Sequence, residues 1–201
     1  MTSIISGLKL AIASTLLAAA TASAATITID FETMPGADGK LGTADDTPMA
    51  SNFVVPIRDQ LTPAGITFSQ GSIMQWGFFD GNAGNHVLSS TSPIGTFSMP
   101  VYGISIESKS YWYATLTAYG ASGNVLATST IPPAPDAVTV LSVSTTEAIA
   151  SFSVLADTPD HILNLDNMVL TVSAVPEPST WAMFGAGIAL LGWRRRRALQ
   201  G

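Results

Sequence analysis

The residues best suited to chemistry in this sequence are oxygen ligands for a hard cation. A glycine-rich segment at residues 36–46 carries three acidic side chains, Asp38, Asp45 and Asp46. Calcium takes six to eight oxygens, which combine carboxylates with the backbone carbonyls of a loop that wraps around the ion. The segment offers both kinds of oxygen, although its spacing is not that of an EF-hand. Two interpretations stay open: a structural calcium ion, or a solvated acidic loop that binds none.

A second group of residues has the composition of a sugar-binding surface. The segment 75–82 is rich in glycine, amide and carboxylate groups, and it carries three aromatic side chains, Trp76, Phe78 and Phe79. Aromatic faces cover the apolar patches of sugars, and polar groups bond their hydroxyls. Three more aromatics share one face of a predicted strand: Tyr111, Tyr113 and Tyr119. We favour the alternative that these rings plug and line one end of the fold.

Recognisable catalytic motifs are absent from the sequence. Each of the two histidines, His86 and His161, lacks a motif neighbour that would mark it as a base or a metal ligand. No nucleophile elbow, zinc-protease helix or phosphate-binding glycine loop occurs. The chain has no cysteine, which excludes disulfides, thiolate metal sites and a cysteine nucleophile. We therefore expect no enzymatic activity, with a small secreted carbohydrate-active enzyme as the alternative.

The charge distribution argues against nucleic acid as a partner. The net charge of the 201 residues is −6, but five of the eight basic residues lie in the two terminal segments. Between residues 25 and 175, thirteen acidic residues stand against three basic ones. Such a domain repels phosphate backbones and anionic lipid headgroups, and it attracts cations.

Strands with a two-residue period must position these side chains. In residues 26–32 the apolar side chains alternate with polar ones, and residues 101–107 repeat the pattern. Within 111–119 we expect Trp112 and the alternating residues after it to point inward, and a glycine-rich turn joins this strand to 125–130. Further strands are expected at 65–69, 85–89, 137–144, 147–155 and 167–173. The fold class is all-β: an antiparallel sandwich of two sheets, best matched by a jelly roll.

The first 24 residues have the organisation of a signal peptide. Lys9 supplies positive charge, residues 10–20 are apolar, and Ala22-Ser23-Ala24 is a small-x-small cleavage signature. The apolar run is short for a membrane-spanning helix. We expect a signal-peptide helix that enters the Sec translocon and is removed by signal peptidase after Ala24.

Residues 175–201 combine three features in a fixed order. A proline-flanked acid opens the segment, an uncharged run from Ser179 to Trp193 follows, and four arginines come next. The residues of the outer two features are Pro176, Glu177, Pro178, Arg194, Arg195, Arg196 and Arg197. Tryptophans at both ends and snorkelling arginines suit a transmembrane helix with its arginines in the cytoplasm. The sequence thus predicts an extracellular β-sandwich domain at 25–174 between two targeting segments.

This tail resembles the PEP-CTERM sorting signal of Gram-negative bacteria, a segment also described as the C-terminal region of ice-binding proteins. The resemblance implies recognition by an exosortase, a membrane enzyme that processes the tail, and an association with exopolysaccharide. It also implies an intermediate anchored in the inner membrane and a mature form at the cell surface or outside the cell. The two prolines fix φ and hold Glu177 extended, as a processing enzyme requires. A plain C-terminal anchor is the alternative.

The domain is loosely similar to bacterial jelly-roll modules of the carbohydrate-binding kind. The similarity rests on Asp30-Phe31-Glu32 in the first strand and Leu165-Asp166-Asn167 at the last one. In such modules carboxylates from the two terminal strands share a structural calcium ion, which here implicates Glu32 and Asp166. The resemblance implies binding of a glycan or a matrix partner without catalysis. A self-associating structural matrix protein is a further alternative.

Overall fold

The computed structural model describes residues 24–49, 55–75, 86–172 and Ile188. Residues Ala24–Ser173 form one compact unit. The predicted signal peptide up to Ser23, the sorting motif and all of the predicted transmembrane helix except Ile188 lie outside the described residues, as do Trp76, Phe78 and Phe79. In the described part of the chain, no helix is both long and apolar enough to cross a membrane.

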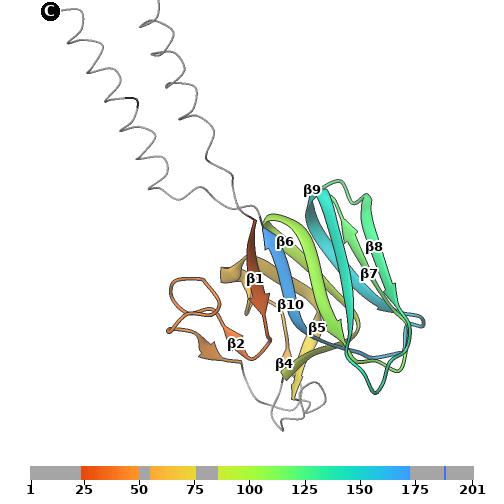
Figure 1. The fold of residues 1–201 in the computed structure, drawn as a ribbon. Coiled ribbons are helices and arrows are strands. Elements are labelled where there is room, and N and C mark those ends of the chain that lie inside the picture. The colour runs from red at the N-terminus through yellow and green to blue at the C-terminus, as the bar shows by residue number, and fades with distance from the viewer. Residues whose placement is uncertain (1–23, 50–54, 76–85, 173–187, 189–201) are drawn as a thin grey trace, which may run out of the picture. The chain divides into compact units, whose positions relative to one another are not determined.

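The described domain is built almost entirely from β-strands (Figure 1). Besides one 3-10 turn, η1 at Thr62–Ala64, the elements are β1 (Ala25–Ile29), β2 (Thr33–Met34), β3 (Thr47–Pro48), β4 (Val55–Pro56), β5 (Ile66–Gln75), β6 (His86–Ser108), β7 (Ala114–Tyr119), β8 (Val125–Ile131), β9 (Thr139–Ala156) and β10 (Leu163–Val172). The all-β prediction is confirmed.

The main sheet has the strand order β1-β10-β6-β9-β7-β8, with β5 against β6 and β4 against β5. Strands β2 and β3 form a separate two-stranded ribbon. The long strands β6 and β9 belong to both layers: the first half of β6 pairs with β5, and its second half pairs with β10 and early β9. Irregular register between Thr96 and Val101 separates the two halves. Strands that change layer through bulges join the two faces of a sandwich.

The first and last strands lie side by side, as Figure 1 shows for β1 and β10. Strand β10 pairs with both halves of β6: its start at Leu163 lies opposite Ser90, and its end at Val172 lies opposite Val101. Within each half of β6, however, the partner numbers fall as those of β10 rise, from Ser108 opposite Leu165 to Val101 opposite Val172. Local pairing in the sandwich is therefore antiparallel.

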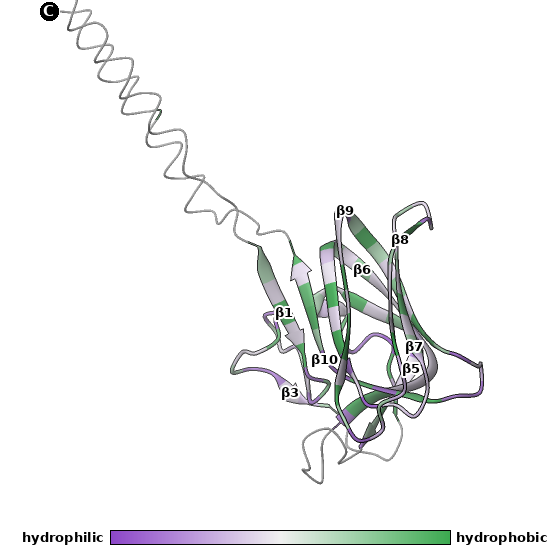
Figure 2. Cartoon of the chain, turned by 45° about the vertical axis from the view of Figure 1, so that its right-hand side comes forward, coloured by the Kyte–Doolittle hydropathy of each residue, from purple (hydrophilic) through white to green (hydrophobic). Residues whose placement is uncertain are grey.

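The core follows the alternation of apolar residues, visible as green segments on the strands in Figure 2. In β7 the residues Ala114, Leu116 and Ala118 are buried, as the sequence predicts. Three phenylalanines make edge-to-face contacts at the centre, with Phe68 6.3 Å from Phe31 and 6.0 Å from Phe152 between ring centroids. Such contacts stabilise a core beyond the burial of apolar area.

Two local predictions are wrong in an informative way. The strand expected from residue 111 begins only at Ala114, and Trp112 does not point into the core, because it is 38% exposed. Strand β1 ends at Ile29, yet Phe31 is still buried, because its backbone turns into the left-handed region at φ 59°. A non-glycine residue held there is strained and needs support from its surroundings.

Candidate functional site

The loop between β6 and β7 exposes three consecutive aromatic side chains. Tyr111 is 64% exposed, Trp112 38% and Tyr113 50%. Large aromatic rings are normally well buried, so a run of exposed rings is a candidate binding surface. We call these three residues together with His161 the aromatic surface.

The Trp112 ring is held by a histidine from the loop between β9 and β10. Trp112 and His161 stack with their ring centroids 3.5 Å apart and their planes at 11°. His161 is itself oriented, because its Nδ1 lies 2.7 Å from Oδ1 of Asp157. One face of the indole is therefore covered by imidazole, and the exposed remainder of the ring is fixed in orientation.

Three loops converge beneath the aromatic surface: residues 109–113, 132–138 and 157–162. Buried Ser110 ties two of them, since its hydroxyl accepts from the Trp112 N–H at 3.1 Å and its carbonyl from the Ala134 N–H at 2.8 Å. The Asp157 N–H donates to the Tyr113 carbonyl at 3.2 Å. These main-chain bonds explain why the strand starts late, because Ser110 turns the chain before β7. These bonds hold the aromatic surface in place.

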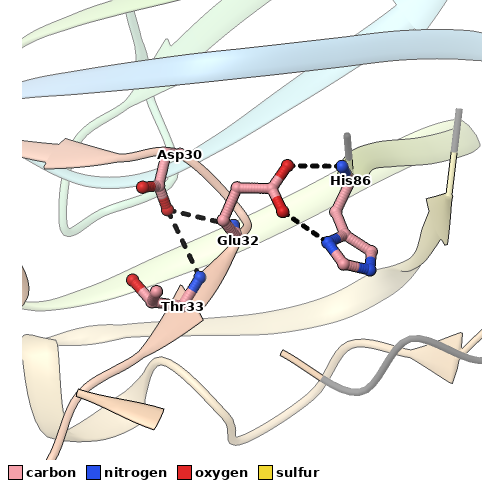
Figure 3. A network of polar contacts seen from close by, with 4 residues as sticks. All are labelled: Asp30, Glu32, Thr33 and His86. Carbon is pink, nitrogen blue, oxygen red and sulfur yellow. Dashed lines mark hydrogen bonds and ion pairs between the residues drawn. The ribbon is translucent and has the colours of Figure 1, made fainter. Parts of the chain in front are cut away.

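A second histidine–carboxylate pair lies at the start of β6 (Figure 3). The Glu32 carboxylate accepts both from the His86 main-chain N–H at 2.5 Å and from its ring Nδ1 at 2.6 Å. Asp30 supports the turn by accepting from the N–H of Glu32 at 3.0 Å and of Thr33 at 3.4 Å. Glu32 thus fastens the turn that follows β1, including the strained Phe31, to the edge of the sheet.

The far nitrogen of His86 is buried, and no described residue bonds it. Because a carboxylate only accepts, Nδ1 is the donor in the bond to Glu32, and Nε2 is the nitrogen left without a partner among the described residues. A carboxylate behind a histidine is also the arrangement found behind metal ligands. Across the described ranges, however, no three His, Asp or Glu side chains gather in a way that could hold a metal ion. The geometry at His86 suits a structural fastening.

The predicted calcium residues lie in three different settings. Asp38, Asp45 and Asp46 share a loop in which the Thr43 hydroxyl lies 2.7 Å from Oδ1 of Asp45 and within 3.4 Å of the other two carboxylates. The bond from Thr43, followed by the main-chain bond from Asp38, lowers the pKa of the exposed Asp45 below its usual 3.8.

The other two predicted ligands are Glu32 and Asp166. Glu32 is occupied by His86, as described above. Asp166 is buried, and its Oδ1 accepts from the Asn167 N–H at 2.7 Å. Calcium at these five residues stays a prediction.

Sequence reasoning missed the central pair of the aromatic surface. It placed Trp112 in the core and assigned His161 no role. The three tyrosines do not share one strand face as predicted. Tyr111 and Tyr113 precede β7, and Tyr119 lies within it with its hydroxyl 3.2 Å from Ser153 Oγ. The available signal was Ser110 directly before three aromatics, because a serine there favours a turn over a continued strand.

Comparison with known proteins identifies the C-terminal segment. Residues 174–197 match the model of the PEP-CTERM protein-sorting motif. The tail is a PEP-CTERM sorting motif. No curated protein matches the chain. The PEP-CTERM segment includes Pro176–Pro178 and all four arginines named above, so the predicted resemblance is confirmed for this part of the chain.

Solved structures show distant likenesses to this chain. A family 29 carbohydrate-binding module complexed with mannohexaose has 10% identity and a TM-score of 0.42, with 75% of this chain and 94% of that one covered. A second family 29 module, from Piromyces equi, has 8% identity and a TM-score of 0.38, with 55% of this chain and 82% of that one covered. An arabinose-bound α-L-arabinofuranosidase has 16% identity and a TM-score of 0.40, with 61% of this chain covered. The chain spans a quarter of that protein's length.

Proposed function

We propose that this exported protein binds a glycan through the aromatic surface, without catalysing a reaction on it. The PEP-CTERM motif indicates an exported protein that is sorted to the cell surface, where polysaccharide is an available partner. The observation that carries the proposal is the exposed Trp112 ring, stacked on His161 and flanked by two exposed tyrosines.

Stacking on such rings is the physical basis of the proposal. Aromatic side chains bury about 150–250 Å² each, so covering even part of several rings with a sugar is favourable at about 25 cal/mol per Å². The stack and the main-chain bonds of Ser110 fix the loop in advance, which lowers the entropic cost of binding. A rigid, open aromatic platform therefore suits the flat apolar face of a pyranose.

The contacts of His161 favour a positional role. Its Nδ1 is bonded to Asp157 and its ring face is stacked against Trp112, so the imidazole holds the indole in place. Processing by an exosortase follows from the sorting motif. Export by the Sec route, cleavage after Ala24, a transient inner-membrane anchor and exopolysaccharide as the partner complete the proposal.

The test uses the full chain in detergent and a panel of polysaccharides. Affinity electrophoresis and calorimetry should detect binding that falls about 10- to 30-fold in Trp112→Ala, as expected for truncation of a binding hot spot. Val125→Ala serves as the control, because Val125 is 57% exposed but lies at the turn end of the β7–β8 hairpin. If no polysaccharide binds in a Trp112-dependent way, the proposal fails.

Two alternatives have their own readouts in the same experiment. New reducing ends released from a bound polysaccharide would show a carbohydrate-active enzyme. Assemblies that grow with protein concentration in the absence of glycan would show a self-associating matrix protein. Either result would replace the proposed function.

A further inference from the structure

The charges around the aromatic surface are almost all negative. The three loops beneath it carry the exposed acids Asp136, Asp157 and Asp160. Their sequences contain one lysine, Lys109, and no arginine. Asp160 directly precedes His161, and Asp136 lies two residues after Ala134, which is bonded to Ser110. Two of the three loops that meet at the rings therefore carry exposed acidic residues.

We propose that the aromatic surface selects neutral, hydroxyl-rich glycans and rejects chains that contain uronic acids. This inference rests on the proposed glycan binding and adds the chemical class of the ligand. Among the described residues, none donates a hydrogen bond to Asp136 or Asp160. Both carboxylates can therefore accept from sugar hydroxyls beside the rings, and bonds to a charged acceptor are the stronger kind.

A uronate in the same place meets repulsion. Charges closer together than the Debye length, roughly 8 Å at physiological salt, are only partly screened, so a uronate bound next to the acids of these loops is repelled by them. In a polyuronate the penalty recurs at every residue that contacts the protein. No arginine in the three loops could pair with a uronate through two hydrogen bonds. The site thus attracts hydroxyls and repels carboxylates with the same side chains.

The charge pattern also disfavours the other occupants of an exposed aromatic surface. Residues 25–175 carry ten more acids than bases, so an anionic membrane repels the domain. A second copy docked face to face would bring two sets of the three acids together. A neutral glycan avoids both penalties.

The experiment compares polysaccharides that differ only in charge. Neutral hexose polymers (a β-glucan, a mannan and a galactan) are tested with the full chain, each beside a derivative oxidised at C6 from hydroxymethyl to carboxylate. We expect at least one neutral polymer to bind in a Trp112-dependent way, and its oxidised form to bind about ten-fold more weakly at low salt, with the gap narrowing as salt screens the charges.

Charge reversal makes the test specific to the loops. Asp136→Lys combined with Asp160→Lys should bring the affinities for the neutral and oxidised polymers close together. Asp59→Lys combined with Glu147→Lys changes the net charge equally in segments outside the three loops, and should leave the preference intact. If both double substitutions change the preference equally, the overall charge of the domain sets it, and the proposed local selectivity is overturned.

The remaining outcomes separate the two proposals. Trp112-dependent binding in which the oxidised polymer equals or exceeds the neutral one overturns the selectivity and leaves glycan binding standing. If Trp112→Ala alters sedimentation of the protein alone while no polymer binds, the surface joins copies of the chain and both proposals fail.

Discussion

The protein uses one chemical pair, a carboxylate bonded to histidine Nδ1, in two different regions. Glu32 holds His86 at 2.6 Å, and Asp157 holds His161 at 2.7 Å. The first pair joins residues 54 apart in the sequence, whereas the second spans a single turn of four residues. Nearly equal distances therefore accompany very different structural contexts.

The surroundings of the rings decide what each pair does. The His86 side chain is 9% exposed, Glu32 also bonds its main chain, and the far nitrogen is buried. The His161 side chain is 25% exposed, and its ring face lies against Trp112. The buried pair fixes the chain, and the exposed pair presents a ring. The comparison teaches that burial and the second contact of the ring, more than the histidine–carboxylate contact itself, distinguish the two pairs.

The largest expected difference between the two pairs appears when each carboxylate is removed in turn. Glu32→Ala leaves two donors of His86 unpaired in a largely buried place, at a cost of about 2–3 kcal/mol in the free energy of unfolding. For a domain of this size the melting temperature should fall by about 5–10 °C. Asp157→Ala, the matched control, should cost about 1 kcal/mol or less, because exposed ion pairs contribute little. Calorimetry that gives equal shifts for both would contradict the comparison.

Calcium binding is a second test of the Glu32–His86 pair, because the ion would compete with His86 for the Glu32 carboxylate. If the predicted ion binds, calcium at about 100 times its dissociation constant adds about 2.7 kcal/mol to the free energy of unfolding. A chelator should then lower the melting temperature of the full chain by several degrees. A melting curve that stays unchanged on chelation removes calcium from all five predicted ligands.

The sequence revealed the layers of the fold better than the site. Period-two alternation located β7 and the buried Ile29 because the side chains of a strand face opposite sides in turn. Strands β6 and β9 are each continuous, although their residues were expected to form separate strands. This could not be predicted, since a bend between layers leaves no apolar pattern in the sequence.

The candidate site escaped prediction for a related reason. Alternation extended backward from Ala114 puts Trp112 inside, and only the turn at Ser110 reverses this. The stack with His161 requires the β6–β7 and β9–β10 loops to meet at one end of the sandwich, which is a property of topology. The same holds for Glu32 and His86, which are brought together by the pairing of distant strands.

A smaller effect separates the two roles of His161, as a stacked ring and as a partner of Asp157. His161→Ala frees the Trp112 face and should weaken glycan binding about five-fold, since an aromatic pair is worth about 1 kcal/mol. His161→Phe restores a stacked ring without the bond to Asp157, so it should recover most of the affinity. Little change in melting temperature is expected for either. Failure of phenylalanine to rescue binding would assign the role to the polar pair.

The smallest effect concerns the acidic loop, where a carboxylate is held by a hydroxyl in place of a histidine. The Thr43 hydroxyl lowers the pKa of Asp45, so the ionised form is favoured in the folded state. The resulting stabilisation is present above the unfolded pKa of about 3.8 and is lost as the pH falls through the lower folded value. Because Asp45 is fully exposed, the effect should be visible in an NMR titration of its carboxyl carbon long before it alters the melting curve. Thr43→Val should return the pKa toward 3.8, and Thr43→Ser, which keeps the hydroxyl, should not. Identical titrations in both variants would show that the main-chain bond from Asp38, and not the hydroxyl, holds the carboxylate.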